Sequence, residues 1–185
     1  MTDPTASAPS DILAFWFSPE VKGKWFVRDD AFDAELRQRF GPLLLDARQG
    51  ELVHWSKSPD GALALVILLD QLSRNIHRGT PEAFASDDMA LAIAERAVDQ
   101  GDDLRLTPEQ RGVLYMPFEH SESLADQDRG VALFEALGEG EALDYMRRHR
   151  EIIARFGRFP HRNTILGRNS TPEEIEFLKQ PGSSF

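Results

Sequence analysis

The most regular hydrophobic pattern in the chain lies at residues 62–69, which read Ala-Leu-Ala-Leu-Val-Ile-Leu-Leu without a polar position. A helix that is apolar on every side is typical of the centre of a domain, where other elements surround it. A buried strand is the alternative interpretation of such a run. The length of the segment from Asp60 to about Ile76 favours the helix, and so does the Asp70–Arg74 pair at a spacing of four residues.

Helical periodicity recurs on both sides of this segment. Phe32, Leu36 and Phe40 repeat at a spacing of four residues, which corresponds to one face of a helix. The dipeptide Gly41-Pro42 is then expected to break or kink that helix. The same periodicity predicts further helices at residues 11–17, 43–49, 126–137 and 141–156.

Helix-start signals appear three times. Ser86 precedes two aspartates, which suit the positive end of a helix, and Gly101 is placed to end that helix. Thr107-Pro108-Glu109-Gln110 and Thr171-Pro172-Glu173-Glu174 both have the capping-box pattern with proline at the first helical position. The sequence therefore predicts helices that begin at residues 87, 108 and 172.

No stretch of alternating apolar and polar residues is long enough for a strand, so we predict an all-α fold of roughly eight to ten short helices. Short turns favour antiparallel helix pairs, packed as a compact bundle or a short solenoid. Residues 1–10 are small, polar and rich in proline, which predicts a flexible tail. Residues 11–180 are expected to form a single helical domain.

Composition narrows the class of function. The net charge of −10 opposes binding to nucleic acid or to an anionic membrane, because phosphate repels an acidic protein. The chain has no cysteine, which excludes disulfides, a thiolate nucleophile and thiolate-bound metals. The first residues do not resemble a secretory signal, and no apolar run is long enough to span a bilayer. We therefore predict a cytoplasmic location.

Arginine is concentrated towards the C-terminal end. Residues 147–168 contain seven arginines and one acidic residue, Glu151, so this segment carries +6 and the rest of the chain −16. A basic segment on an acidic body favours a small anion over a long polyanion as the ligand. The alternative is that arginines such as Arg147, Arg148 and Arg150 pair with the surplus of acidic side chains.

Three polar segments stand out, and the first is Asp70–Gly79, which follows the apolar run. It places Asp70, Arg74 and Arg78 four residues apart along one helical face. Charge at the end of an apolar helix is unfavourable unless it is paired or faces a ligand. Arg74, Asn75 and Arg78 are therefore candidate ligand-binding residues. The alternative is a buried Asp70–Arg74 ion pair, with arginines at the helix end that favours cations.

The second segment is Pro117–Glu122. Pro117 removes one helical hydrogen bond and is expected to end or kink its helix. His120 and Glu122 are candidates for acid and base, because histidine titrates near neutral pH. A His-x-Glu pair also occurs in zinc deaminases, but the cysteine ligands of that motif are missing, so no metal is predicted. A polar turn without catalytic function is the alternative.

The third segment is residues 155–168. Phe159 precedes proline and should be extended, while Pro160 suits the start of a helix whose first turn holds His161. Backbone N–H groups at such a start attract anions, and arginine adds a planar fork that fits carboxylate or phosphate. The candidates are His161 as a catalytic residue and, for binding, Arg158, Arg162, Asn163 and Arg168. A structural loop is the alternative.

Taken in order, the three segments resemble the bacterial family called domain of unknown function 924. The resemblance rests on residues 68–79, 117–122 and 155–168 and extends from Ile12 to about Leu178, with Ser73 as a mild departure. It implies an all-helical, tetratricopeptide-like superhelix. It implies no activity and supplies no catalytic residues.

Two hypotheses of function follow. In the first, the three segments converge on a pocket for a small anionic metabolite, with or without catalysis; an enzyme of this kind would be a hydrolase or lyase without an organic cofactor. In the second, a helical-repeat scaffold binds an acidic peptide or protein partner in a groove. The sequence lacks the glycine-rich dinucleotide motif, the P-loop, the serine hydrolase elbow and the zinc protease motif. The sequence does not predict the oligomeric state.

Overall fold

A computed structural model describes residues 8–25, 27–138 and 140–184. These residues are all-helical and include no strand, which confirms the predicted fold class. They divide into two compact units, which are described separately: unit 1 (Met1–Arg78 and Glu82–Pro117) and unit 2 (Gly79–Pro81 and Phe118–Phe185). The tetratricopeptide-like arrangement and the single domain over residues 11–180 stay predictions. Of the predicted tail, residues 1–7 lie outside the described residues.

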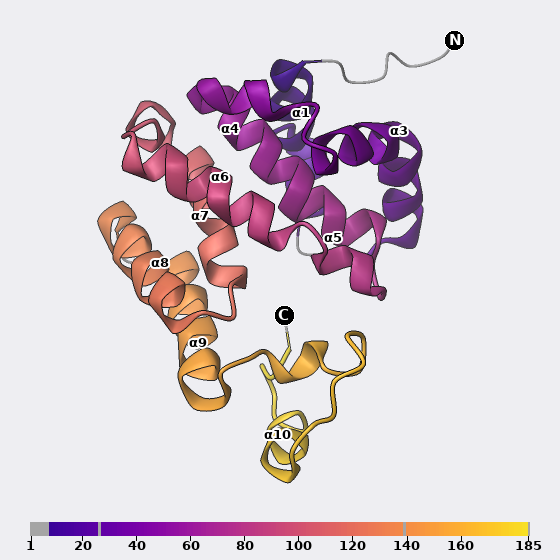
Figure 1. Ribbon diagram of the computed structural model, residues 1–185, viewed down its shortest axis with the longest axis vertical. Coiled ribbons are helices and arrows are strands. Elements are labelled where there is room, and N and C mark those ends of the chain that lie inside the picture. Colours follow the sequence, from indigo (N-terminus) through magenta and orange to yellow (C-terminus); the bar gives the residue numbers. More distant parts are fainter. Residues whose placement is uncertain (1–7, 26, 139, 185) are drawn as a thin grey trace. The chain divides into compact units, whose positions relative to one another are not determined.

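Unit 1 is built around the apolar helix. This helix runs through α4 (Pro59–Val66), a π-helical stretch (Ile67–Leu72) and α5 (Ser73–Ile76). Every residue from 59 to 73 is buried except Asp60. The helices that pack against it are α1 (Pro9–Trp16), α3 (Asp30–Arg48) and α6 (Asp87–Asp99) (Figure 1). The central, buried position predicted from the apolar run is confirmed.

The start of this helix has a clear local cause. The side chain of Ser58 accepts a hydrogen bond from the Gly61 N–H at 3.2 Å, and Pro59 occupies the first helical position. The π-helical stretch that follows was not predicted, because its residues have the same apolar pattern as an ordinary buried helix. Such stretches hold one extra residue within a turn and occur often near functional sites.

The remaining elements of unit 1 are α2 (Pro19–Lys22), the 3-10 helices η1 (Val53–Lys57) and η4 (Asp103–Arg105), and most of both η3 (Pro81–Phe84) and α7 (Pro108–His120). The predicted capping box of α7 is present, because Thr107 and Gln110 exchange hydrogen bonds at 3.0 and 3.3 Å.

At two prolines the sequence predicted a break or a kink, and neither helix breaks there. Helix α3 runs unbroken with Pro42 inside it, and α7 continues for three residues beyond Pro117. An internal proline removes one hydrogen bond, which buried contacts on both sides can offset. In α3 these contacts come from Phe40 and Leu44, whose side chains are almost fully buried.

Unit 2 contains the end of α7, followed by α8 (Leu124–Leu137), α9 (Glu141–Phe156), the 3-10 helix η5 (Pro160–Arg162) and α10 (Pro172–Phe177). Helices α8 and α9 form an antiparallel pair (Figure 1). Gly130 allows their close approach, since a Cβ there would lie 2.8 Å from the Met146 side chain. Ile152, Ile153 and Phe159 form a small core against Phe156 and Phe177.

Helix α9 ends at Gly157, which has a φ of +68° and so takes a left-handed conformation that favours glycine. The chain is then extended at Phe159, as predicted for a residue before proline. The expected helix start at Pro160 is realised only as the single turn η5. None of the described helices is both long and apolar enough to cross a membrane.

Candidate functional site

The first polar segment lies almost entirely in unit 1, where Arg74 faces two carboxylates. Its Nη1 atom lies 3.0 Å from Asp70 Oδ1 and 2.8 Å from Asp87 Oδ1, while its Nη2 atom lies 2.9 Å from Asp87 Oδ2. The Asp70–Arg74 ion pair, which was the alternative to a ligand role, is therefore present. The Asp70 side chain is fully buried, and burying an unpaired carboxylate is strongly unfavourable. The ion pair with Arg74 compensates this charge.

Arg78 and Asn75 of the same segment both donate to Asp33 on α3. Arg78 Nε lies 2.5 Å and Asn75 Nδ2 lies 2.9 Å from the carboxylate oxygens. Burial acts to raise the pKa of Asp33, but these hydrogen bonds outweigh it and hold the pKa below its usual value. In the structure all three candidates of the first segment hold carboxylates of their own unit, and their role towards a ligand stays a prediction.

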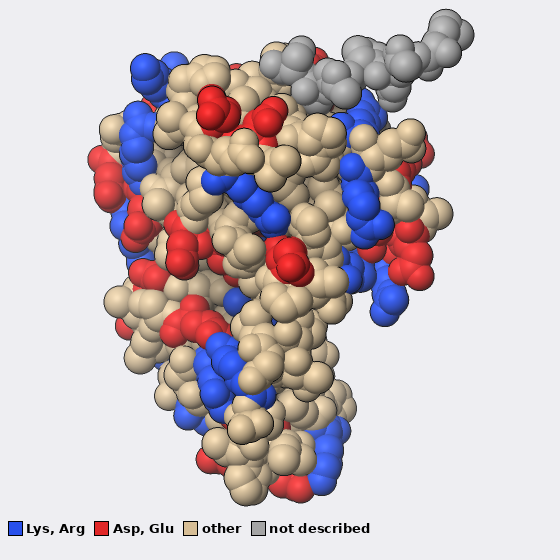
Figure 2. Space-filling model, turned by 45° about the vertical axis from the view of Figure 1, so that its right-hand side comes forward, with Lys and Arg blue, Asp and Glu red and all other residues tan. Residues whose placement is uncertain are grey.

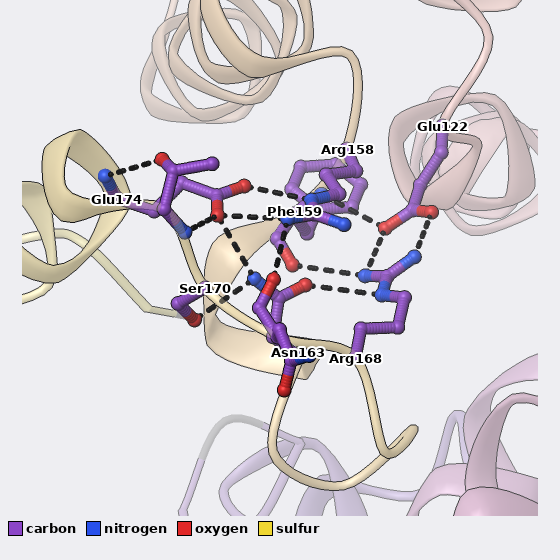
Figure 3. A network of polar contacts seen from close by, with 9 residues as sticks. Glu122, Arg158, Phe159, Asn163, Arg168, Ser170 and Glu174 are labelled. Atoms are coloured by element: carbon purple, nitrogen blue, oxygen red, sulfur yellow. Dashed lines mark hydrogen bonds and ion pairs between the residues drawn. The ribbon is translucent and has the colours of Figure 1, made fainter.

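The second and third segments meet inside unit 2 through Glu122 (Figure 3). The carboxylate of Glu122 accepts two hydrogen bonds from Arg168, at 2.6 and 2.9 Å, and one from the Phe159 N–H at 2.8 Å. Burial acts to raise the pKa of Glu122, but the bonds from Arg168 and Phe159 bring it below its usual value. Glu122 is thus an ionised carboxylate that ties the end of α7 to the third segment.

A second network holds the third segment to α10 through Glu174 (Figure 3). The fork of Arg158 donates to both oxygens of Glu174, from Nε at 2.7 Å and from Nη2 at 2.8 Å. Asn163 donates to Glu174 at 3.3 Å and accepts from Arg168 Nε at 3.0 Å, so it links the two networks. The bonds from Arg158 above all lower the pKa of Glu174 to about 2.

Other arginines of the basic segment also face carboxylates. Arg147 lies 3.1 Å from Glu135, Arg150 lies 2.6 Å from Asp128, and Arg155 lies 2.8 Å from Glu173. On the face drawn in Figure 2, basic and acidic side chains lie next to one another. For Arg147 and Arg150 the alternative of pairing with acidic side chains is therefore confirmed.

A cluster of histidines is the most unusual feature of unit 2. Three of the five histidines in the chain belong to this unit: His120 ends α7, His149 lies on α9 and His161 lies in η5. The His149 ring is 6.5 Å from His120 and 5.6 Å from the fully buried Phe159, whose other neighbour is His161 at 5.6 Å. We call His120, His149 and His161 the histidine cluster.

Positive charge adjoins this cluster. The guanidinium of Arg162 lies 4.5 Å from the centre of the Phe159 ring, and the residue is only 6% exposed. Burial, followed by the charge of Arg162 and the neighbouring histidines, lowers the pKa of His161 to about 4. His161 is therefore neutral at pH 7 and can both donate and accept a hydrogen bond.

The low pKa of His161 predicts a specific NMR result. In a pH titration, the ring proton signals of His161, assigned with a His161→Gln variant, should not titrate between pH 8 and about pH 5, unlike those of an ordinary histidine. In the unfolded chain His161 takes up a proton near pH 6.5, whereas in the folded chain it does so only near pH 4. The free energy of unfolding should therefore fall as the pH is lowered from 6.5 to 4. A His161 midpoint near 6.5 would contradict this burial.

Two residues of this region were not predicted, namely Glu119 and His149. The Nδ1 atom of His149 lies 3.0 Å from Glu119 Oε1 and 2.8 Å from the Tyr145 carbonyl oxygen. The sequence does indicate that His149 is buried. It follows Met146 by three residues and precedes Ile152 by three, which places it on the buried face of α9. A polar side chain on the buried face of a helix usually has a buried hydrogen-bond partner.

No set of three or more histidine, aspartate or glutamate side chains in the described part of the chain is arranged to hold a metal ion. The predicted acid and base candidates lie in two different environments. His120 and His161 belong to the histidine cluster, whereas Glu122 is held by Arg168 and the Phe159 N–H. Their roles in catalysis stay predictions.

Comparison with known proteins yields a family and a related fold. The sequence profile of the family described as bacterial protein of unknown function (DUF924) matches residues 12–182. The solved structure of a protein of unknown function from Agrobacterium tumefaciens is similar, with 41% identity, a TM-score of 0.87, and coverage of 95% of this chain and 99% of that one. No curated protein matches the chain. With a match over nearly its whole length, the chain belongs to the bacterial family of unknown function 924.

Proposed function

We propose that unit 2 binds a small anionic metabolite beside the histidine cluster and carries out acid/base chemistry on it, of hydrolase or lyase type, without an organic cofactor. In this proposal Arg162 attracts the anion, while His120 and His161 donate and accept hydrogen bonds to it. Glu122 and Arg168 fix the position of the third segment through their ion pair and the bond to the Phe159 N–H.

The observation that carries the proposal is the arrangement of the cluster. The imidazoles of His149 and His161 and the guanidinium of Arg162 lie around the buried ring of Phe159, and the His120 ring adjoins His149. The charge of Arg162 disfavours the protonated form of His161, while the carboxylates Glu119 and Glu122 adjoin the cluster on other sides. An anion beside Arg162 would gain charge-assisted hydrogen bonds. We infer an anionic ligand from this guanidinium.

Several of the candidate ligand-binding residues hold carboxylates of the chain. Arg158, Arg168 and Asn163 hold Glu174 and Glu122, and Arg74 and Arg78 hold carboxylates of unit 1. An incoming anion would have to displace these internal carboxylates, which are fixed in place by several bonds each. We assign the ligand to Arg162 because its guanidinium lies beside the histidine cluster, 4.5 Å from the centre of the Phe159 ring.

The alternative function is a scaffold for an acidic peptide or protein, and it has less support. A peptide groove needs several apolar side chains side by side. The large exposed apolar residues of the described chain instead lie on separate elements or in a loop: Val27, Leu45, Val53, Leu104, Leu124, Tyr145 and Ile175.

Thermal unfolding with inorganic phosphate at low ionic strength tests the proposal. A ligand that binds the folded state stabilises it by about 2.7 kcal/mol at a concentration 100 times its Kd. For a chain of this size we expect the Tm to rise by about 5 °C or more. Sulfate and citrate, measured in parallel, distinguish a preference for phosphate from a general preference for anions.

Variants locate the effect. His161→Gln and Arg162→Gln should each abolish the rise in Tm relative to their own value without anion. Arg150→Gln is the matched control, because this arginine also belongs to the basic segment but pairs with Asp128 at the surface. A Tm that no anion changes, or a rise that survives in His161→Gln and Arg162→Gln, would refute the proposal. Stabilisation by a polyglutamate peptide alone would favour the scaffold.

A further inference from the structure

A buried glutamine on α8 holds the turn that follows α7. Gln127 lies on the buried face of α8 and is fully buried. Its Nε2 atom donates to the carbonyl oxygens of Phe118, Glu119 and Ser121, at 3.2, 2.7 and 2.8 Å. Since a carbonyl oxygen can only accept, these contacts fix the orientation of the amide. The Ser121 hydroxyl also donates to Asp126 at 2.7 Å, so the turn is bound to α8 at two places.

The same turn carries Glu122 to the third polar segment (Figure 3). Glu122 directly follows Ser121, whose carbonyl oxygen Gln127 holds. Its carboxylate accepts from the Phe159 N–H at 2.8 Å and from Arg168 at 2.6 and 2.9 Å. A chain of direct contacts therefore leads from α8 through the turn to the backbone of Phe159.

Loss of the Gln127 amide should be felt along this chain of contacts. The last carbonyl groups of a helix lack helical donors and need other partners. Without Nε2, the carbonyl groups of Glu119 and Ser121 would lose a donor in a buried place, which is unfavourable. The turn would have to move until water reaches them. Glu122 belongs to the turn and would move away from the Phe159 N–H.

We propose that Gln127 is a positioning residue of the anion site, which fixes the turn after α7 so that Glu122 keeps the third segment in place. The guanidinium of Arg162 lies 4.5 Å from the Phe159 ring, so a shift at Phe159 displaces the group assigned to the anion. The effect on a ligand rests on the function proposed above. The link from Gln127 to Glu122 does not, and it can be tested without a ligand.

Hydrogen exchange measured by NMR on the full chain tests the link. Gln127→Met keeps the side-chain length but removes both N–H donors. Exchange of the Phe159 N–H should become about tenfold faster relative to the buried amides of α9. The pKa of Glu122 should rise towards its usual value, because Phe159 and Arg168 now lower it. Gln180→Met, at an exposed position, is the control and should change neither. Unchanged exchange at Phe159 would overturn the link.

A double variant shows whether the two residues act in series. Glu122→Gln breaks the second contact, so adding it to Gln127→Met should speed exchange no further than the stronger single variant does. Additive effects would overturn the inference. If Gln127→Met does not fold, the unmodified chain in low urea decides. The side-chain amide protons of Gln127 and the Phe159 N–H should then become exposed together, and a Phe159 N–H that stays protected alone would refute the link.

Thermal unfolding with inorganic phosphate tests the effect on the ligand. Gln127→Met should lose most of the rise in Tm that phosphate gives the unmodified chain, each relative to its own value without phosphate, and Gln180→Met should keep it. If Gln127→Met keeps the rise and His161→Gln abolishes it, this inference fails and the proposed function stands. If phosphate changes no Tm, the proposed function fails, and hydrogen exchange alone decides whether Gln127 positions Glu122.

Discussion

Replacing Gly61 with alanine should lower the free energy of unfolding by about 3 kcal/mol or more, which is a large effect for one methyl group. A Cβ at this position would lie 2.7 Å from the carbonyl carbon of Trp55 and closer still to its oxygen. Both are backbone atoms, so they cannot rotate away as a flexible side chain would. Helix η1 or the first turn of α4 must therefore shift.

The measurement is urea unfolding followed by circular dichroism, with Gly112→Ala as the matched control. Gly112 lies within α7, and a Cβ there meets nothing within 4 Å. Alanine is the better helix former, so the control should gain up to about 1 kcal/mol. If Gly61→Ala unfolds at the same urea concentration as the unmodified chain, the close contact between η1 and α4 is wrong.

Glu174→Gln should lower the free energy of unfolding by about 2–3 kcal/mol, because it puts an amide where a buried carboxylate accepts from several donors. Arg158 donates to both oxygens, and Asn163 and the Thr171 N–H donate to one of them. The NH₂ group of glutamine can accept none of these bonds, and it also takes away the charge that pairs with Arg158.

The adjacent Glu173→Gln is the control, since Glu173 is 63% exposed and its ion pair with Arg155 lies at the surface. Such pairs contribute little, so the change should stay below about 0.5 kcal/mol. The effect of Glu174→Gln should also depend on pH. The pKa of Glu174 in the folded chain lies well below its usual value, so the stabilisation is full above about pH 4.5 and is lost as the pH falls towards 2. A difference from the unmodified chain that persists at pH 2 would contradict the assignment.

The fold could be predicted to the extent that local patterns determine it. The apolar run at residues 62–69 predicted the central helix, and the capping residues predicted starts at 87, 108 and 172, where α6, α7 and α10 begin. At Pro42 and Pro117 the sequence left open a break or a kink, because a local rule gives only the cost of the proline. Whether a helix tolerates that cost depends on packing by distant residues, which a single sequence does not reveal.

The candidate site could be predicted in its residue types but not in its pairings. Arg78 is recognisable in the sequence, yet its partner Asp33 lies 45 residues away, and Arg168 is separated from Glu122 by 46. The neighbouring sequence does not distinguish an arginine that binds a ligand from one that pairs with a carboxylate far away in the chain. His149 was missed for the related reason that its neighbours on α9 are exposed arginines, which draw attention to the wrong face of the helix.

The π-helical stretch at Ile67–Leu72 determines which way the residues after it face. Removing one residue there would restore a regular helix and rotate everything after it by about 100°. Arg74 and Arg78 would then turn away from Asp87 and Asp33, which lie on other helices. The turns between the other helices can absorb an insertion or deletion, whereas this segment cannot. This chain shortened by one residue at this place should therefore lose the ion pairs Arg74–Asp87 and Arg78–Asp33.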